Sequence, residues 1–468
     1  MDRKHNKNIV PFEKELKVGY AASNINPKMG FGIMGYYVPR YVSGFLDDLE
    51  TSAVVLAQGD KRIAIISVDV CSLTVAQAEE IKQVVFKQTG IPAAHIFIST
   101  IHTHTGPLLM PSSIFDTTKE EIQEYLDFLM SRIADTVQLA LDSLKPAKIG
   151  YGIGRVADRV AYIRRYKMKD GSTMTCPPVE DPDILHPIGE IDKRVNVVRI
   201  DREGADSIVL VNYGVHADTV NGDLVSPDWP GWMRKTIAKT LDGAKCVFIT
   251  GAQGDVGSTN VHPQGGDMND TEISFDNEMK SPGMARFIGR AMAGTVLQVY
   301  DKVKYIDVDE IDILHKTIRV PSNMPTPEQL VLARKYNELH EAGRDDEIPY
   351  AAMELTTVVA ESARMCLLAN GPAFFDFDLT GIKIGEIAMV GIPGEPFTEI
   401  SMKIKETEGW GLILVCELVN GHYGYFPVKS AYDEGGYEAR SSKFKAGVGE
   451  IILDGCKVLL GEMESSLG

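Results

Sequence analysis

Apolar runs typical of strands alternate with periodic segments typical of helices along most of the chain. Residues 62–70, RIAIISVDV, are apolar almost throughout, which predicts a strand buried on both faces. Residues 74–90 follow with apolar positions at helical spacing and end at a glycine, and 95–100, HIFIST, is again typical of a strand. This order of strand, helix and strand predicts two parallel neighbouring strands joined by a right-handed crossover.

The same patterns extend over the rest of the chain. Further strands are predicted at 207–216, 245–252, 374–385, 386–394 and 411–420. Helices are predicted at 118–144, 230–241, 282–300, 326–342, 350–369 and 396–407, the first of them opened by a capping box of Thr117 and Glu120. Two long segments rich in glycine, proline and aspartate, 168–193 and 259–281, are predicted to be loops, which at this length are either functional or disordered.

No repeat and no clear linker divides this succession of elements. We therefore expect an α/β fold in one large domain over residues 17–468, with a mixed, largely parallel central sheet flanked by helices. Residues 1–16 are expected to form a flexible N-terminal tail. In open α/β sheets, ligands bind at the edge formed by the carboxyl ends of the strands, so we expect the functional site there.

The segment STIHTHTGP places His102 and His104 directly after the strand predicted at 95–100. In an extended segment, residues two apart point to the same side, so both imidazoles can face one cavity. That arrangement suits metal binding or proton transfer. The alternative is structural, with both histidines only hydrogen-bonded within a loop.

Other polar residues repeat this placement at the ends of apolar strands. His216 ends IVLVNYGVH, Glu395 ends AMVGIPGE, and Tyr425 and Tyr437 follow the strand that ends at Asn420. Each has a structural interpretation when taken alone: a core histidine, a first-turn helix residue, and tyrosines that pack in loops. Because one parallel sheet brings its carboxyl ends to one edge, the side chains are expected to converge.

Composition narrows the choice of partners. The net charge of −17, from 48 basic and 65 acidic residues, disfavours nucleic acid and anionic lipid as partners. The apolar runs are too short for stable membrane insertion, and the N-terminus has no apolar stretch that would act as a signal peptide. Six scattered cysteines without a CxxC pair indicate buried free thiols in a reducing compartment, so a cytoplasmic location is expected. The sequence leaves a monomer and a homo-oligomer open.

Several motifs occur in an order known from one enzyme family. They begin with VGYAASNINP and MGYYVPRYVSGFLDDLETSAVVL, and continue with SVDVCSL, STIHTHTGP, YIRRYKMKDG, VHADTV, GAQGDVGS, PGEPFTEIS and YGYFPVKSAYDEGGYEAR. Together they resemble the catalytic domain of the neutral (non-lysosomal) ceramidases, a family of zinc amidases. The resemblance covers residues 17 to 465, and implies that 17–468 is a catalytic domain of this kind, without the family's C-terminal Ig-like domain.

The resemblance also implies roles for individual residues. The zinc ligands would be His102, His216, Glu395 and Tyr425. His104 and Tyr437 would face the substrate, with His104 as a proton shuttle and Tyr437 as an oxyanion donor. The family's active-site arginine is best matched by Arg164, although Ile163 replaces the usual asparagine before it and Arg165 is a second candidate.

Departures from the family pattern shape the expected function. Gly257 occupies the position of the family's serine and Ser258 lies one residue later, so a zinc-activated water is the expected nucleophile. The expected reaction is cleavage of an amide (N-acyl) bond in a small or acylated substrate other than membrane ceramide. The alternatives are an ester, a lactone or a carbohydrate linkage cut by the same metal site, or a non-catalytic binding relative. The complete residue set argues against the last.

Overall fold

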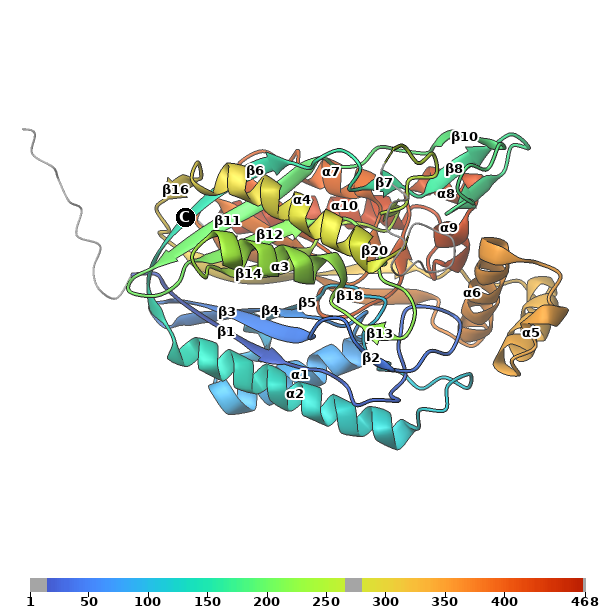
Figure 1. Cartoon of the computed structure of the whole chain (residues 1–468), viewed down its shortest axis with the longest axis horizontal. Coiled ribbons are helices and arrows are strands. Elements are labelled where there is room, and N and C mark those ends of the chain that lie inside the picture. Colours follow the sequence, from blue (N-terminus) through green and yellow to red (C-terminus); the bar gives the residue numbers. More distant parts are fainter. Residues whose placement is uncertain (1–14, 266–279, 466–468) are drawn as a thin grey trace, which may run out of the picture.

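The computed structural model describes residues 15–265 and 280–465. Its largest element is a nine-stranded mixed sheet, which runs across the middle of Figure 1. The strands are β1 (Lys17–Asn24), β3 (Glu50–Gln58), β4 (Lys61–Val68), β5 (Ile96–Thr100), β6 (Lys145–Arg155), β11 (Arg194–Arg202), β12 (Ile208–Tyr213), β14 (Lys245–Thr250) and β16 (Lys304–Ile306). Their order is β14-β12-β11-β6-β1-β3-β4-β5, and β16 pairs with β6.

A second sheet packs against one face of the first. Its strands are β17 (Ile311–Pro321), β18 (Phe374–Ile384), β19 (Ile387–Gly391) and β21 (Leu412–Cys416), paired in that order. Side chains such as Ile65, Leu210 and Met389 form the apolar cluster between the two sheets. The strand at 62–70 is therefore buried on both faces over most of its length, as its apolar run predicted, and the strand at 386–394 is buried in the same way.

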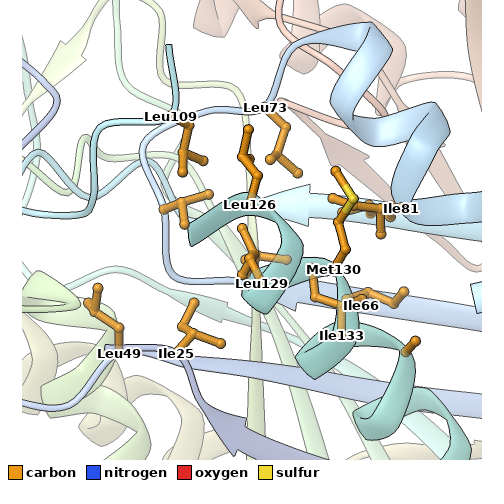
Figure 2. Packing of buried hydrophobic residues seen from close by; sticks show 14 of the residues in the cluster. Ile25, Leu49, Ile66, Leu73, Ile81, Leu109, Leu126, Leu129, Met130 and Ile133 are labelled. Atoms are coloured by element: carbon orange, nitrogen blue, oxygen red, sulfur yellow. The ribbon is translucent and has the colours of Figure 1, made fainter. Parts of the chain in front are cut away.

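Helices cover the outer faces and complete a four-layered molecule. One half of the large sheet is covered by α1 (Val75–Thr89) and α2 (Lys119–Asp142), and the other by α3 (Asp228–Thr240) and α4 (Pro282–Tyr300). Figure 2 shows Leu129 and Ile133 of α2 packed toward Ile66 of β4. The second sheet is covered by α7 (Thr398–Ile404) and α10 (Val448–Ser465). The hairpin of α5 (Pro327–Glu341) and α6 (Ala352–Leu368) stands at one side in Figure 1.

The mixed α/β architecture confirms the expected fold class, but the sheet is not largely parallel. In the two large sheets of the described chain, parallel pairing joins β4 to β5, β12 to β14 and β19 to β21. The other neighbours, including β11 with β6 and β17 with β18, are antiparallel. The prediction was wrong here because several strands that make antiparallel pairs were not recognised: β1, β3, β6, β11 and β17.

Two predicted boundaries move by a residue or two. The capping box of α2 is formed by Thr118 and Glu121, whereas Thr117 is buried before the helix begins. Residues 1–14 of the expected tail lie outside the described chain, but Leu16 is buried in the core between the sheets. The folded body therefore includes this residue.

The segment predicted as a loop at 168–193 contains a small sheet. It pairs β8 (Arg165–Met168) with β9 (Thr173–Thr175) and β10 (Ile184–Pro187). The other predicted loop, 259–281, lies mostly outside the described residues. The remaining short elements are β2 (Gly44–Phe45), β7 (Tyr162–Ile163), β13 (Leu224–Val225), β15 (Val256–Gly257), β20 (Glu395–Pro396), β22 (Tyr425–Phe426), α8 (Lys429–Glu434), α9 (Tyr437–Ser441) and two 3-10 turns, Ala93–His95 and Asp345–Glu347.

All six cysteines are free thiols, as predicted, but not all are buried. Cys71, Cys246, Cys416 and Cys456 are buried, Cys366 is half-buried, and Cys176 is exposed in the small sheet region. Within residues 15–265 and 280–465, no helix has both the length and the apolar character needed to cross a membrane.

Candidate metal and substrate site

The carboxyl ends of the three parallel strand pairs meet at one place. His102 follows β5, His216 follows β12, and Glu395 follows β19. One ligand atom from each lies within 4.8 Å of the others, and all three side chains are buried. The short parallel bridge of β20 and β22 then places Tyr425 directly beside Glu395 in register. The strand-end rule thus located the central residues of this site even though the sheet is mostly antiparallel.

Each histidine is oriented by a backbone carbonyl. His102 Nδ1 lies 2.9 Å from the carbonyl oxygen of Cys71, and His216 Nδ1 lies 3.0 Å from that of Val256. A carbonyl can only accept, so each Nδ1 carries a proton and donates it. This leaves both Nε2 atoms to face Glu395 Oε2, at 3.4 Å from each. Orientation of metal-binding histidines through the second ring nitrogen is the usual arrangement in proteins.

The electrostatics of this cluster favour a cation. Burial opposes the charged form of His102, but the carboxylate of Glu395 outweighs it and raises the pKa of His102. The pKa of Glu395 is correspondingly lowered, although burial acts in the opposite direction. Burial, with the charge of Arg164, lowers the pKa of His216 to about 4, so that this imidazole is neutral at pH 7. A proton on His102 and a metal ion are alternative ways to balance the buried carboxylate.

A metal ion fits the donor set of this site. Glu395 Oε2 is buried without a hydrogen-bond partner among the described residues, and it faces two imidazole nitrogens. Two imidazoles and a carboxylate are ligands that zinc takes in catalytic sites, where a further position stays open. A second candidate group, Cys71, His102 and His104, also has ligand atoms within 4.8 Å. There the Cys71 sulfur lies 3.7 Å from His102 Nδ1, the nitrogen already bonded to a carbonyl, so that group fits less well.

The structure separates the two candidate arginines. Arg164 Nη1 lies 3.1 Å from His216 Nε2, and Arg164 Nη2 donates to the Tyr425 hydroxyl at 3.1 Å. Glu438 holds this guanidinium by accepting from Arg164 Nε at 2.7 Å. Arg165 points elsewhere, donating to Glu434 and to the Gly435 carbonyl, both at 3.0 Å. Of the two residues, Arg164 is the one beside the cluster.

His104 and Tyr437 lie next to the ligand cluster. The His104 ring centroid is 4.9 Å from that of His102 and 5.8 Å from that of His216. Tyr437 begins α9 after Gly435 and Gly436, whose positive φ angles of 83° and 94° suit glycine. Its ring lies 5.6 Å from that of Tyr425. Burial raises the pKa of Tyr437, so its hydroxyl is a proton donor at neutral pH.

Several residues beside the site were not predicted to act in it. His422 Nε2 lies 2.8 Å from Glu395 Oε1, the carboxylate oxygen turned away from His102. Asp218 Oδ1 lies 3.5 Å from His104 Nδ1, and Tyr37 hydrogen-bonds to Tyr437. His422 lies three residues before Tyr425 in a segment whose tyrosines were already candidates, so proximity in sequence was an available signal. Asp218, two residues after the candidate His216, offered the same signal, whereas Tyr37 approaches from a separate segment.

Position 257 also borders the site. A Cβ added to Gly257 would lie 3.6 Å from Arg164 Cβ, which is ordinary van der Waals contact. The neighbouring Ser258 is buried, at 7% exposure. A serine at 257 would therefore meet Arg164, whereas this chain has its serine one residue later.

Comparison with solved structures places this geometry in a known fold. A crystal structure titled as neutral ceramidase from Pseudomonas aeruginosa superposes with a TM-score of 0.71 over 96% of this chain and 75% of that one. The chain has the neutral ceramidase fold. A second structure, titled as ceramidase complexed with C2, gives a TM-score of 0.70 over 96% and 76% of the two chains. Both are 15% identical in sequence to this chain.

Sequence comparison alone does not find this relationship. No protein-family model matches the chain, and no curated protein has a significant match to it. The ceramidase fold and the resemblance in motif order therefore rest on independent observations, one from the backbone and one from short segments of sequence.

Proposed function

We propose that this protein is a zinc-dependent hydrolase that cleaves an amide (N-acyl) bond by attack of a metal-activated water. The observation that carries the proposal is the convergence of two correctly oriented imidazole nitrogens on the unpartnered Oε2 of Glu395. The ceramidase fold supports the amide bond as the bond that is cut.

His102, His216 and Glu395 would hold the ion, with the Tyr425 hydroxyl as a fourth donor. Zinc, when bound, would lower the pKa of water toward about 7 and polarise the acyl carbonyl. Arg164 lies within reach of Tyr425 and stabilises negative charge on its oxygen. Burial on its own raises the pKa of Tyr425, so the ion and Arg164 are the groups that would favour its phenolate.

The other side chains would act on the substrate. His104, whose ring lies beside those of His102 and His216, would carry a proton from the attacking water to the leaving amine. Burial lowers its pKa, so the imidazole is neutral at pH 7 and has a lone pair that can accept this proton. The Tyr437 hydroxyl would donate to the oxygen that becomes negative in the transition state. Tyr36, Tyr37, Asp218 and Lys280, which lie around these two residues, are polar or charged. These polar neighbours support a small N-acyl substrate over the two chains of membrane ceramide.

The test combines metal analysis with a substrate panel. Purified protein should hold about one zinc per chain and hydrolyse short N-acyl amines, and chelation should abolish the activity. Ser258→Ala should keep most of kcat, because the nucleophile is not a serine. A covalent adduct on Ser258, or a loss of about 10⁴-fold, would assign the attack to the serine instead.

The same panel separates the alternative functions. The metal site would also suit an ester, a lactone or a carbohydrate linkage, and turnover of these in preference to amides would replace the amide proposal. Zinc binding without turnover of any of them would indicate a binding relative. Ceramide in anionic vesicles should be a poor substrate, because the chain carries a net charge of −17. The six free thiols support a reducing, cytoplasmic location.

A further inference from the structure

Asp218 is the centre of a polar cluster beside His104. It follows His216 by two residues, and its Oδ1 lies 3.5 Å from His104 Nδ1. Its Oδ2 accepts from Lys280 Nζ at 3.0 Å, and its Oδ1 accepts from the Tyr36 hydroxyl. The two chain segments are also joined directly, because the His104 backbone N–H donates to the Ala217 carbonyl at 3.1 Å.

This cluster holds Asp218 as a fixed anion. The ammonium of Lys280, 3.0 Å from Asp218 Oδ2, offsets the charge of this buried carboxylate. Tyr36 is itself held on two sides: Lys280 Nζ donates to its hydroxyl at 3.1 Å, and the Arg40 guanidinium lies 4.3 Å from its ring centroid. Arg40 also donates to the His104 carbonyl at 2.7 Å. The carboxylate and the backbone of His104 are thus fixed by the same group of residues.

The orientation of the His104 ring, in contrast, depends on few contacts. Neither of its ring nitrogens has a hydrogen-bond partner among the described residues. Asp218 is the anion that faces its Nδ1, and the separation of 3.5 Å is longer than an ordinary hydrogen bond. Catalytic hydrogen bonds are often long before substrate binds and shorten in the complex.

We propose that Asp218 is a positioning residue for His104: it accepts the Nδ1 proton, and so leaves the Nε2 lone pair as the basic atom that faces the substrate. The reasoning is the same as for any imidazole base oriented by a carboxylate, where the wrong tautomer puts a proton on the atom that must accept one. Asp218 takes no part in bond cleavage and holds no metal. The inference rests on the proposed hydrolase function.

The decisive variant is Asp218→Asn, which keeps the size of the side chain and removes its charge. We expect kcat to fall by about 10²–10⁴-fold, the range for a general base, while KM changes by less than about threefold and zinc content stays near one per chain. Because this variant removes the carboxylate that faces Lys280, the double variant Asp218→Asn/Lys280→Met should show the same fall in kcat with a higher melting temperature.

Asp192 supplies a matched control. It is also a largely buried aspartate paired with a lysine, at 2.9 Å from Lys405 Nζ, and its other charged partner is Arg194 in place of a histidine. Asp192→Asn should lower the melting temperature and leave kcat within about twofold, the behaviour of a purely structural carboxylate. If Asp218→Asn gives the same result as Asp192→Asn, the positioning role is wrong.

A spectroscopic readout tests the tautomer without turnover. In protein labelled with ¹⁵N-histidine, the His104 signals, assigned by their loss in His104→Gln, should report a proton on Nδ1 in the wild type. In Asp218→Asn they should shift toward the Nε2-protonated form. An unchanged tautomer, or a raised KM with normal kcat, would overturn the inference. The proposed function would fail separately, through a wild-type protein without zinc or without hydrolysis.

Discussion

The two halves of the nine-stranded sheet each supply one histidine to the site, but they do so in opposite chain order. In the half covered by α1 and α2, the first strand of the parallel pair, β4, leads to the carbonyl of Cys71, and the second, β5, leads to His102. In the half covered by α3 and α4, the first strand, β12, leads to His216, and the second, β14, leads to the carbonyl of Val256.

The difference shows which feature of the fold the site requires. Either strand of a parallel pair can carry the histidine, provided that the neighbouring strand ends in a carbonyl that accepts from Nδ1. The position of the motifs at the ends of adjacent parallel strands therefore indicates the location of the site better than their order along the chain does. The three parallel pairs of the two large sheets lie where the site is, whereas antiparallel pairing forms the rest of these sheets.

The comparison predicts that the two histidines are equivalent as ligands. His102→Ala and His216→Ala should each reduce zinc to below about a tenth of an equivalent and lower kcat/KM by more than about 10³-fold, beyond the 10–100-fold typical of outer-shell partners. Elemental analysis beside steady-state kinetics measures both effects. The exposed His186 provides the control, and His186→Ala should behave as the wild type. If one ligand variant keeps its metal and activity, the two halves do not share one ion.

Residues outside the ligand set should affect turnover without affecting the metal. His104→Ala should lower kcat by about 10²–10⁴-fold, as for a lost general base, and Tyr437→Phe by about 10²–10³-fold, as for a lost oxyanion donor. Zinc content should stay near one per chain in both. Loss of the metal in either variant would make that residue a ligand and contradict the division between the ion and the substrate.

The two halves of the sheet are also joined by a buried ion pair, and breaking it should cost stability. Arg234 of α3 donates to both oxygens of Asp69, which follows β4, at 2.8 and 2.6 Å. Removal of one partner of a buried pair costs about 3–5 kcal/mol when the remaining charge has no other partner. Glu50 lies 3.2 Å from Arg234 Nε and compensates part of the charge, so Asp69→Asn should lower the free energy of unfolding by up to about that amount. Urea denaturation measures this change.

An exposed ion pair gives the matched comparison for this stability measurement. Asp376 bonds Arg319 on the solvent side of the second sheet, and Asp376→Asn should shift the denaturation midpoint far less. Equal shifts for the two variants would show that the Asp69–Arg234 pair does not hold the halves together.

The sequence predicted those parts of the fold whose side chains carry a strong pattern. Strands β4, β12 and β19 are buried on both faces over most of their length, so apolar residues dominate their sequences. Strand β6 was missed because glycines replace side chains at alternate positions. A Cβ at Gly152 would lie 2.4 Å from Val299 Cγ1 of α4, so the strand needs glycine for the helix to pack there. Strand β17 was missed because polar residues interrupt it.

The same reasoning explains which site residues could be predicted. His102, His216 and Glu395 each follow a recognisable strand, and one rule about strand ends brings them together. The roles of Arg164, Tyr425 and Tyr437 came from a resemblance in motifs, not from any rule of spacing. Asp218 and His422 lie within three residues of candidates in the sequence, but their contacts with His104 and Glu395 join segments far apart in the chain, and no spacing rule predicts such contacts.

The smallest effect is expected at Cys71, which distinguishes the two candidate metal groups. The backbone carbonyl of Cys71 orients His102 by accepting from its Nδ1. The Cys71 sulfur lies 3.7 Å from this same protonated nitrogen. Cys71→Ala keeps the backbone and removes the thiol, so zinc content should stay near one per chain. We expect kcat to stay within about threefold of the wild type, well below the 10–100-fold cost of losing an outer-shell partner.

Cobalt substitution sharpens the measurement, because a thiolate ligand gives an intense charge-transfer band in the near ultraviolet that imidazole and carboxylate ligands lack. We expect no such band in the wild type. Its presence, with loss of zinc in Cys71→Ala, would place the ion among Cys71, His102 and His104, and would confine the metal to one half of the sheet.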